Sequence, residues 1–170
     1  VHVHAGRDNF VENNVIVDCA KQQFVLSGHD PKYHAWLIAR HREAFLKYHK
    51  NPAYAKYPEV PALDPKEAWQ MVGNRFCRNI VCYHAPEARL YQRNADPFDK
   101  QNESDNNVIW HGGQTIKIYQ TGPKDVPKEQ TWDEWRRRGF DAHSVVADPL
   151  FLDAAKDDYR LRPESPALKL

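Results

Sequence analysis

The sequence lacks several features that would assign it quickly to a class of protein. Its 170 residues include only three cysteines, Cys19, Cys77 and Cys82, and no Cys-x-x-Cys pair. An odd number of cysteines without paired spacing argues against a disulfide framework, so buried free thiols are expected instead. No run of about 18 apolar residues is present, and no transmembrane helix or membrane partner is therefore expected.

The sequence also lacks an excess of charge of one sign. It contains 24 Lys and Arg against 23 Asp and Glu, for a formal net charge of +1. Nucleic-acid-binding domains usually gather basic residues on one face, so no nucleic-acid partner is expected. The sequence motifs of serine hydrolases, phosphate-binding loops, zinc proteases and dinucleotide-binding folds are absent as well. Neither a cofactor nor a metal ion is expected.

The sequence does contain a ten-residue repeat. Each copy has an Asn, four further residues, a second Asn and then three apolar residues, and the copies are 9–18, 74–83 and 102–111. Asn tolerates the left-handed backbone of a tight corner, and its amide can bond to the chain above and below. Short strands between such corners are typical of a stacked repeat. The pattern predicts a structural ladder of Asn9, Asn14, Asn74, Asn79, Asn102 and Asn107.

The spacing of the copies predicts a helical insertion. They begin 65 and 28 residues apart. One coil needs about 22–28 residues, so about 40 extra residues separate the first two copies. Within 28–72, Asp30-Pro31 is a helix N-cap followed by proline, and apolar residues recur after it at helical spacing. Capping boxes predict two further short helices, one beginning at 64–67 and one over 131–139.

Two parts of the chain resemble a known family. The segment 6–19 (GRDNFVENNVIVDC) resembles the GGRDN-x-x-ENN-x-x-x-DC turn of bacterial right-handed parallel β-helix repeat proteins in the pectate-lyase-like superfamily, with Ala5 in place of one glycine. The segments 140–153 and 158–167 resemble their closing segment. The resemblance implies an all-β solenoid, a right-handed parallel β-helix of which residues 1–170 form the C-terminal part, interrupted by the helical insertion.

The resemblance also implies a carbohydrate-active protein. Its expected partner is a polysaccharide or oligosaccharide, bound by a monomer that is secreted, periplasmic or on the cell surface. Both ends of the sequence read as cut, so a signal peptide would lie upstream of this fragment. A glycoside hydrolase that acts on plant or host polysaccharide through paired carboxylates is the first hypothesis. A polysaccharide lyase and a non-catalytic glycan-binding or surface module are the alternatives.

Three carboxylates are the catalytic candidates. Glycoside hydrolysis needs two carboxyl groups about 5–10 Å apart, and neighbouring strands lie about 4.8 Å apart. Glu12 and Asp105 occupy the same position in different copies, with Cys77 between them. Asp8 is the leading acid candidate, beside Arg7 and just after the first predicted strand. Solvated corner residues and an Asp–Arg pair that holds the turn are the structural alternatives.

Imidazole, cationic and aromatic side chains are the candidates for substrate binding. His2 and His4 share one face of a strand and could bond to sugar hydroxyls, while no third metal ligand accompanies them. Trp110 could stack on a sugar ring, and His34 and His41 in the inserted helix could line one wall of a cleft. The candidates are His2, His4, Arg7, Arg89, Trp110, His111, Lys117 and Tyr119.

Two further predictions concern how side chains are arranged. Counting from the second Asn of each copy places Arg89 and Lys117 in one outward column, with a tyrosine two residues later in each copy. Such a column could bind an acidic glycan, although most are solvated faces. In the closing segment, Asp141 and His143 are expected to form a buried structural pair.

Overall fold

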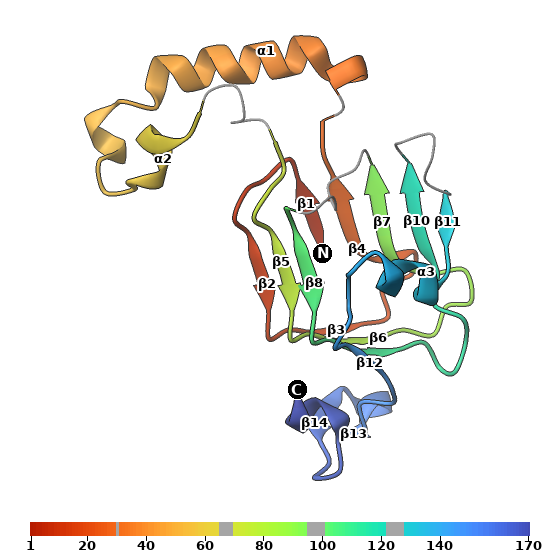
Figure 1. Ribbon diagram of the computed structural model, residues 1–170. Helices are drawn as coiled ribbons and strands as arrows, with labels where there is room; N and C mark the ends of the chain where they lie inside the picture. The colour runs from red at the N-terminus through yellow and green to blue at the C-terminus, as the bar shows by residue number, and fades with distance from the viewer. Residues whose placement is uncertain (30, 65–69, 95–100, 122–127) are drawn as a thin grey trace.

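The computed structural model describes the whole chain except residues 30, 65–69, 95–100 and 122–127 (Figure 1). Its strands form three small sheets and one hairpin. The β4 sheet has the order β1-β4-β7-β10-β11, from β1 (His2–His4), β4 (Gln22–Ser27), β7 (Arg89–Asn94), β10 (Ile118–Thr121) and β11 (Glu129–Gln130). The β5 sheet has the order β2-β5-β8, from β2 (Phe10–Glu12), β5 (Arg75–Cys77) and β8 (Glu103–Asp105). The β6 sheet has the order β12-β9-β6-β3, from β3 (Val15–Val17), β6 (Ile80–Cys82), β9 (Val108–Trp110) and β12 (Val145–Val146).

The chain passes through the sheets in a repeating order. It runs from the β5 sheet to the β6 sheet and then to the β4 sheet, and each pass adds one strand to every sheet (Figure 1). Every pairing in these sheets is parallel except that of β11 with β10. The equivalent positions Val15, Ile80 and Val108 pair with one another, so the repeat copies are stacked in register.

The predicted class, an all-β solenoid or right-handed parallel β-helix, is wrong for this chain. The structure is mixed: it combines several small parallel sheets with short helices, it is 24% helical, and no closed solenoid is detected over the residues that the structure describes. The physical reason is the length and composition of the segments between the short strands. These segments are rich in helix-forming residues and fold as helices outside the sheets.

The helices lie mostly between β4 and β5. They are α1 (Pro31–Tyr48), the 3₁₀ helix η1 (Pro52–Tyr54) and α2 (Glu59–Ala62). The predicted caps at Asp30 and over 65–67 lie outside the described residues. No helix of the described chain is long and apolar enough to cross a membrane.

A second group of short elements follows the last repeat copy. The helix α3 (Trp132–Arg137) begins at a capping box in which Thr131 accepts from the Glu134 backbone. The chain ends in the antiparallel hairpin of β13 (Phe151–Asp153) and β14 (Asp158–Leu161), with the 3₁₀ helices η2 (Ala154–Lys156) and η3 (Pro166–Lys169).

The core lies between the three sheets. In the three-residue strands the central side chain points inward, as with Phe76, Val81 and Ile109, because side chains alternate along a strand. Phe24 packs edge-on against Phe76 at a ring-centroid distance of 5.4 Å and stacks on Tyr91 at 5.3 Å. This aromatic contact joins the β4 sheet to the β5 sheet.

The corners between β5-sheet and β6-sheet strands are turned by a left-handed residue. Asn13, Arg78 and Asn106 occupy equivalent corners, with φ of +58°, +56° and +55°. The left-handed residue is therefore the one before the second Asn of each copy. The repeat pattern had instead predicted a left-handed backbone at the second Asn itself. Ala5 also has a positive φ, of +51°, at the position where the family pattern has glycine.

The six repeat asparagines form two hydrogen-bonded columns across the strands. In one column Asn9 Nδ2 donates to Asn74 Oδ1 at 2.7 Å, and Asn74 Nδ2 donates to Asn102 Oδ1 at 2.9 Å. In the other, Asn14 Nδ2 donates to Asn79 Oδ1 at 3.1 Å, and Asn79 Nδ2 donates to Asn107 Oδ1 at 3.2 Å. The four accepting Oδ1 atoms, those of Asn74, Asn79, Asn102 and Asn107, also accept the backbone N–H of the preceding Asn in the column. Every amide thus bonds to the turn above or below.

We expect Asn79→Ala to destabilise the protein by about 3 kcal/mol, because a buried carbonyl and a backbone N–H would lose their partners. Asn79 is almost fully buried, and its side chain bonds to Val11 O as well as to both neighbours in the column. Urea unfolding would measure the loss. Asn14→Ala is the matched control at the exposed end of the same column, with an expected loss of about 1 kcal/mol. Equal losses for the two variants would contradict a cooperative ladder.

Candidate functional site

The outward face of the β5 sheet carries two of the predicted catalytic carboxylates. Glu12 pairs in register with Cys77, and Cys77 pairs with Asp105, so the three side chains form one column across the sheet. Two strand spacings separate the acids, which amounts to about 9.6 Å between their backbones. The thiol between them is fully buried, and burial raises the pKa of Cys77 to about 11. Cys77 is therefore a protonated, unreactive spacer.

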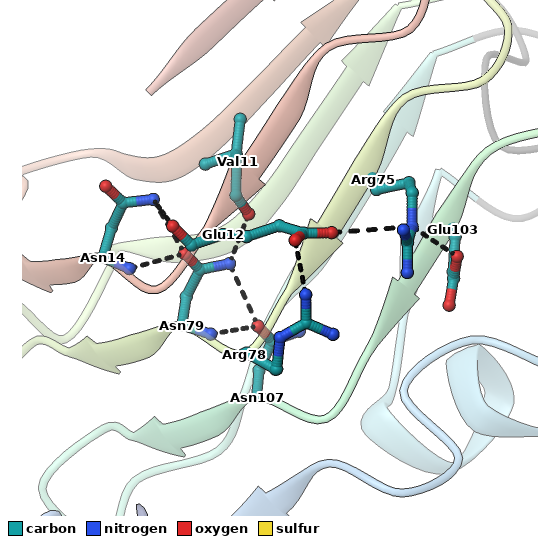
Figure 2. A network of polar contacts seen from close by, with 8 residues as sticks. All are labelled: Val11, Glu12, Asn14, Arg75, Arg78, Asn79, Glu103 and Asn107. Atoms are coloured by element: carbon teal, nitrogen blue, oxygen red, sulfur yellow. Dashed lines mark hydrogen bonds and ion pairs between the residues drawn. The ribbon is translucent and has the colours of Figure 1, made fainter.

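Glu12 is held by two arginines (Figure 2). Its Oε2 lies 2.5 Å from Arg78 Nη2, and its Oε1 lies 3.5 Å from Arg75 Nε. Arg75 also reaches Glu103 Oε2 at 2.9 Å, so the charges alternate along the face. Only 17% of the Glu12 side chain is exposed. Each oxygen of the Glu12 carboxylate thus faces a guanidinium group.

Asp105 is bound by His143. The backbone N–H of His143 donates to Asp105 Oδ1 at 2.7 Å, and the His143 ring Nδ1 lies 2.6 Å from Oδ2. Burial by itself raises the pKa of Asp105, but the hydrogen bonds from His143 outweigh it, and the net effect lowers the pKa. The expected pair of His143 with Asp141 is wrong, because His143 is exposed and faces Asp105.

Asp8 and Arg7 lie at a separate, tight turn. Asp8 has a φ of +53°, and its backbone N–H donates to Val72 O at 3.0 Å. Its carboxylate lies so close to Gly73 that a Cβ there would be 2.0 Å from Asp8 Oδ1. Arg7 donates to the Gln70 carbonyl at 3.4 Å. This packing suits a residue that shapes the turn.

The outward face of the β4 sheet is polar. Gln92 Oε1 accepts from Gln22 Nε2 at 2.7 Å and from Arg89 Nη1 at 3.2 Å. The Arg89 guanidinium lies 4.2 Å from the centre of the Tyr119 ring. A groove continues from this point, lined by Arg89, Thr115, Ile116, Lys117, Ile118, Tyr119, Glu129, Gln130 and Thr131. The face therefore brings together three of the predicted binding residues, Arg89, Lys117 and Tyr119.

The predicted columns of this sheet are wrong in register. Tyr91 pairs with Ile118, and Tyr119 pairs with Gln92, so Lys117 does not align with Arg89. Tyr91 is fully buried and belongs to the core. Lys117 instead turns to Glu87, with Nζ 2.9 Å from Oε2. The glutamines of this face were not identified as binding candidates from the sequence, because they belong to no motif. The alternation of side chains along β7 could have marked Gln92 as outward.

The other predicted binding residues are divided between surface and interior. His2 Nε2 lies 3.0 Å from Ser27 Oγ at the far edge of the β4 sheet, and His4 is exposed on the same strand. His111 is 1% exposed, stacks on Tyr83 at 4.1 Å, and has both ring nitrogens within 3.0 Å of backbone carbonyls. It is thus unable to reach a substrate. Trp110 is half-buried in β9, outside the polar face.

The described residues were also compared with the ligand sets that metal ions require. Among the described His, Cys, Asp and Glu side chains, no group of three or more is arranged to hold a metal ion.

Comparison of the chain with models of protein families, with curated proteins and with solved structures finds no match. The geometry of the two faces is therefore the basis for a functional proposal.

We expect His143→Ala to raise the pKa of Asp105 and to destabilise the protein by about 1 kcal/mol near neutral pH. Folding lowers the pKa of Asp105, so its contribution is present above the unfolded-state pKa and is lost as the pH falls through the folded value. The stability difference between variant and parent should therefore shrink in acid. Carboxyl NMR titration and urea unfolding would measure the two effects.

His84→Ala is the matched control for this experiment. His84 binds Asp18 through the same two atoms, its backbone N–H and ring Nδ1, but both side chains are more than half exposed. We expect a smaller loss of stability, because solvent screens the exposed pair. Equal effects of the two variants would show that burial of Asp105 adds nothing to the interaction.

Proposed function

We propose that the chain takes part in carbohydrate recognition and binds an oligosaccharide or polysaccharide along the outer face of the β4 sheet. The observation that carries this proposal is the continuous polar row of Gln22, Gln92, Arg89 and Tyr119, which leads into the groove beside β10. Amide, guanidinium and phenol groups supply both donors and acceptors for sugar hydroxyls. Aromatic rings add apolar area at little cost in entropy. A small number of polar groups in a concave site is the usual basis of ligand orientation.

The resemblance of the opening and closing motifs to carbohydrate-active bacterial proteins supports the same class of ligand. Polysaccharides of plant or host origin lie outside the bacterial cell. A secreted, periplasmic or cell-surface location therefore belongs to the same proposal, as does action as a monomer.

We expect Arg89→Ala and Tyr119→Ala each to weaken glycan binding about tenfold, which corresponds to about 1.4 kcal/mol. Titration calorimetry against a panel of neutral and acidic oligosaccharides would measure this. Arg160→Ala is the control, because Arg160 is an exposed arginine paired with Asp158 on β14, away from the β4 sheet (Figure 1). Failure of the parent protein to bind any glycan, or equal losses in all three variants, would contradict the proposal.

Glycoside hydrolysis is the second candidate, because Glu12 and Asp105 share one outward column. Their backbones lie about 9.6 Å apart, just above the about 6.5–9.5 Å that separates the two carboxyl groups of inverting glycosidases. The pairing of both acids with basic side chains argues for a structural role, and binding is therefore the better supported function.

If the column is catalytic, Glu12→Gln and Asp105→Asn should each reduce the release of reducing sugar at least about 100-fold, as loss of a general acid or base does. If the column is structural, both variants should be less stable but should release reducing sugar at the same rate as the parent protein. Release of unsaturated uronate, seen by its ultraviolet absorbance, would indicate a lyase instead. An assay of purified protein on a polysaccharide panel distinguishes these outcomes.

A further inference from the structure

Five imidazoles gather where the inserted helix meets the β4 sheet. His29, just after β4, is the centre of this imidazole cluster. Its ring centroid lies 5.6 Å from that of His4, 5.4 Å from that of His34 and 5.3 Å from that of His41. His2 extends the row, with its ring 5.7 Å from His4. The cluster joins β1, the end of β4 and α1.

The cluster is a contact between α1 and the strands. His34, whose backbone is non-helical at a kink in α1, and His41 both reach His29. Elsewhere α1 is largely exposed, Trp36 for 62% of its surface, and it extends above the sheet ends (Figure 1).

The environment of His29 favours the neutral ring. Its side chain is almost fully buried, and burial is the largest cause that lowers its pKa; the charges of His41, His4 and His34 lower the pKa further. The described charged groups that act on His29, from β1 and from α1, are thus all imidazoles. Neutral rings pack together, whereas neighbouring imidazolium ions repel one another in a partly buried site.

We propose that the imidazole cluster is a pH-sensitive latch, which holds α1 against β1 and β4 while the rings are neutral and releases the helix when they are protonated. The latch goes beyond glycan binding, which requires no motion of the helix. It lies at the His2 edge of the β4 sheet, where His2 also bonds to Ser27. Release of α1 in acid exposes the buried His29 beside that edge.

The direction of the pH effect follows from proton linkage. Packing lowers the pKa of His29 below its usual 6.5, so the docked state binds fewer protons than the released state. The stabilisation of the docked helix is full above the released-state pKa and is lost as the pH falls below it. Each pKa unit of lowering corresponds to about a tenfold change in the opening equilibrium.

Hydrogen exchange of the α1 backbone tests the latch. Protection factors over 35–47, corrected for the intrinsic exchange rate at each pH, should fall about tenfold or more between about pH 7.5 and about pH 5. A released helix of this length is marginally stable in water and exchanges quickly. The strands β6 and β9 should keep their protection, which shows that the fold is intact. Equal protection of α1 at both pH values would overturn the proposal.

Two variants and a control test whether the imidazole cluster causes the loss of α1 protection in acid. His29→Phe keeps an aromatic ring but removes the charge, so α1 should stay protected at both pH values. His41→Gln, at an exposed position, should reduce the response, and it serves if His29→Phe fails to fold. His49→Phe is the control: His49 stacks on Phe45 at the end of the same helix, outside the cluster, and should leave the response unchanged. A response that persists in His29→Phe, or one that a chelator abolishes, would refute a proton latch.

Discussion

The hydrogen bond from one asparagine amide to the next is the interaction on which the rest of the structure depends. Within each column, the Oδ1 of the second and third Asn accepts both the side-chain and the backbone N–H of the Asn before it, so neighbouring asparagines are held one strand spacing apart at a defined rotation. This sets the register of the β5 and β6 sheets together. A slip of one residue would turn Phe76 and Val81 outward and Arg75 inward.

The ladder ends on a buried carboxylate. Asn107 donates its backbone N–H to Ser144 Oγ and its side-chain N–H to Asp141 Oδ1. Asp141 also accepts from the Trp135 indole at 2.7 Å and from Ser104 at 2.8 Å. A buried carboxylate is tolerated when enough donors surround it, and these donors come from α3, β8 and the closing segment. The end of the repeat stack and the last part of the chain are therefore joined at one residue.

The faces of the molecule differ in how their charges are satisfied. On the β5 sheet Glu12 lies between two arginines, and Asp105 is hydrogen-bonded to His143. On the β4 sheet Arg89 bonds to a neutral amide and stacks on Tyr119, which leaves donors and acceptors that a neutral, hydroxyl-rich ligand can use. This difference is the reason for proposing that the ligand binds to the β4 sheet.

The sequence by itself predicted the interactions that are local or that recur at identical positions of the repeat. The asparagines, the Thr131 capping box and the helical pattern after Pro31 each specify an interaction within a few residues or between identical positions of the repeat. The alignment of Glu12 with Asp105 follows from the same repeat. The fold class, the columns of the β4 sheet and the partner of His143 were decided only by the tertiary structure. The turn before β10 is one residue shorter than the turn before β7, and a difference of one residue shifts the register of every outward position between the two strands. The imidazole cluster likewise depends on where the inserted helix packs, because contacts between distant segments leave no periodic signal in the sequence.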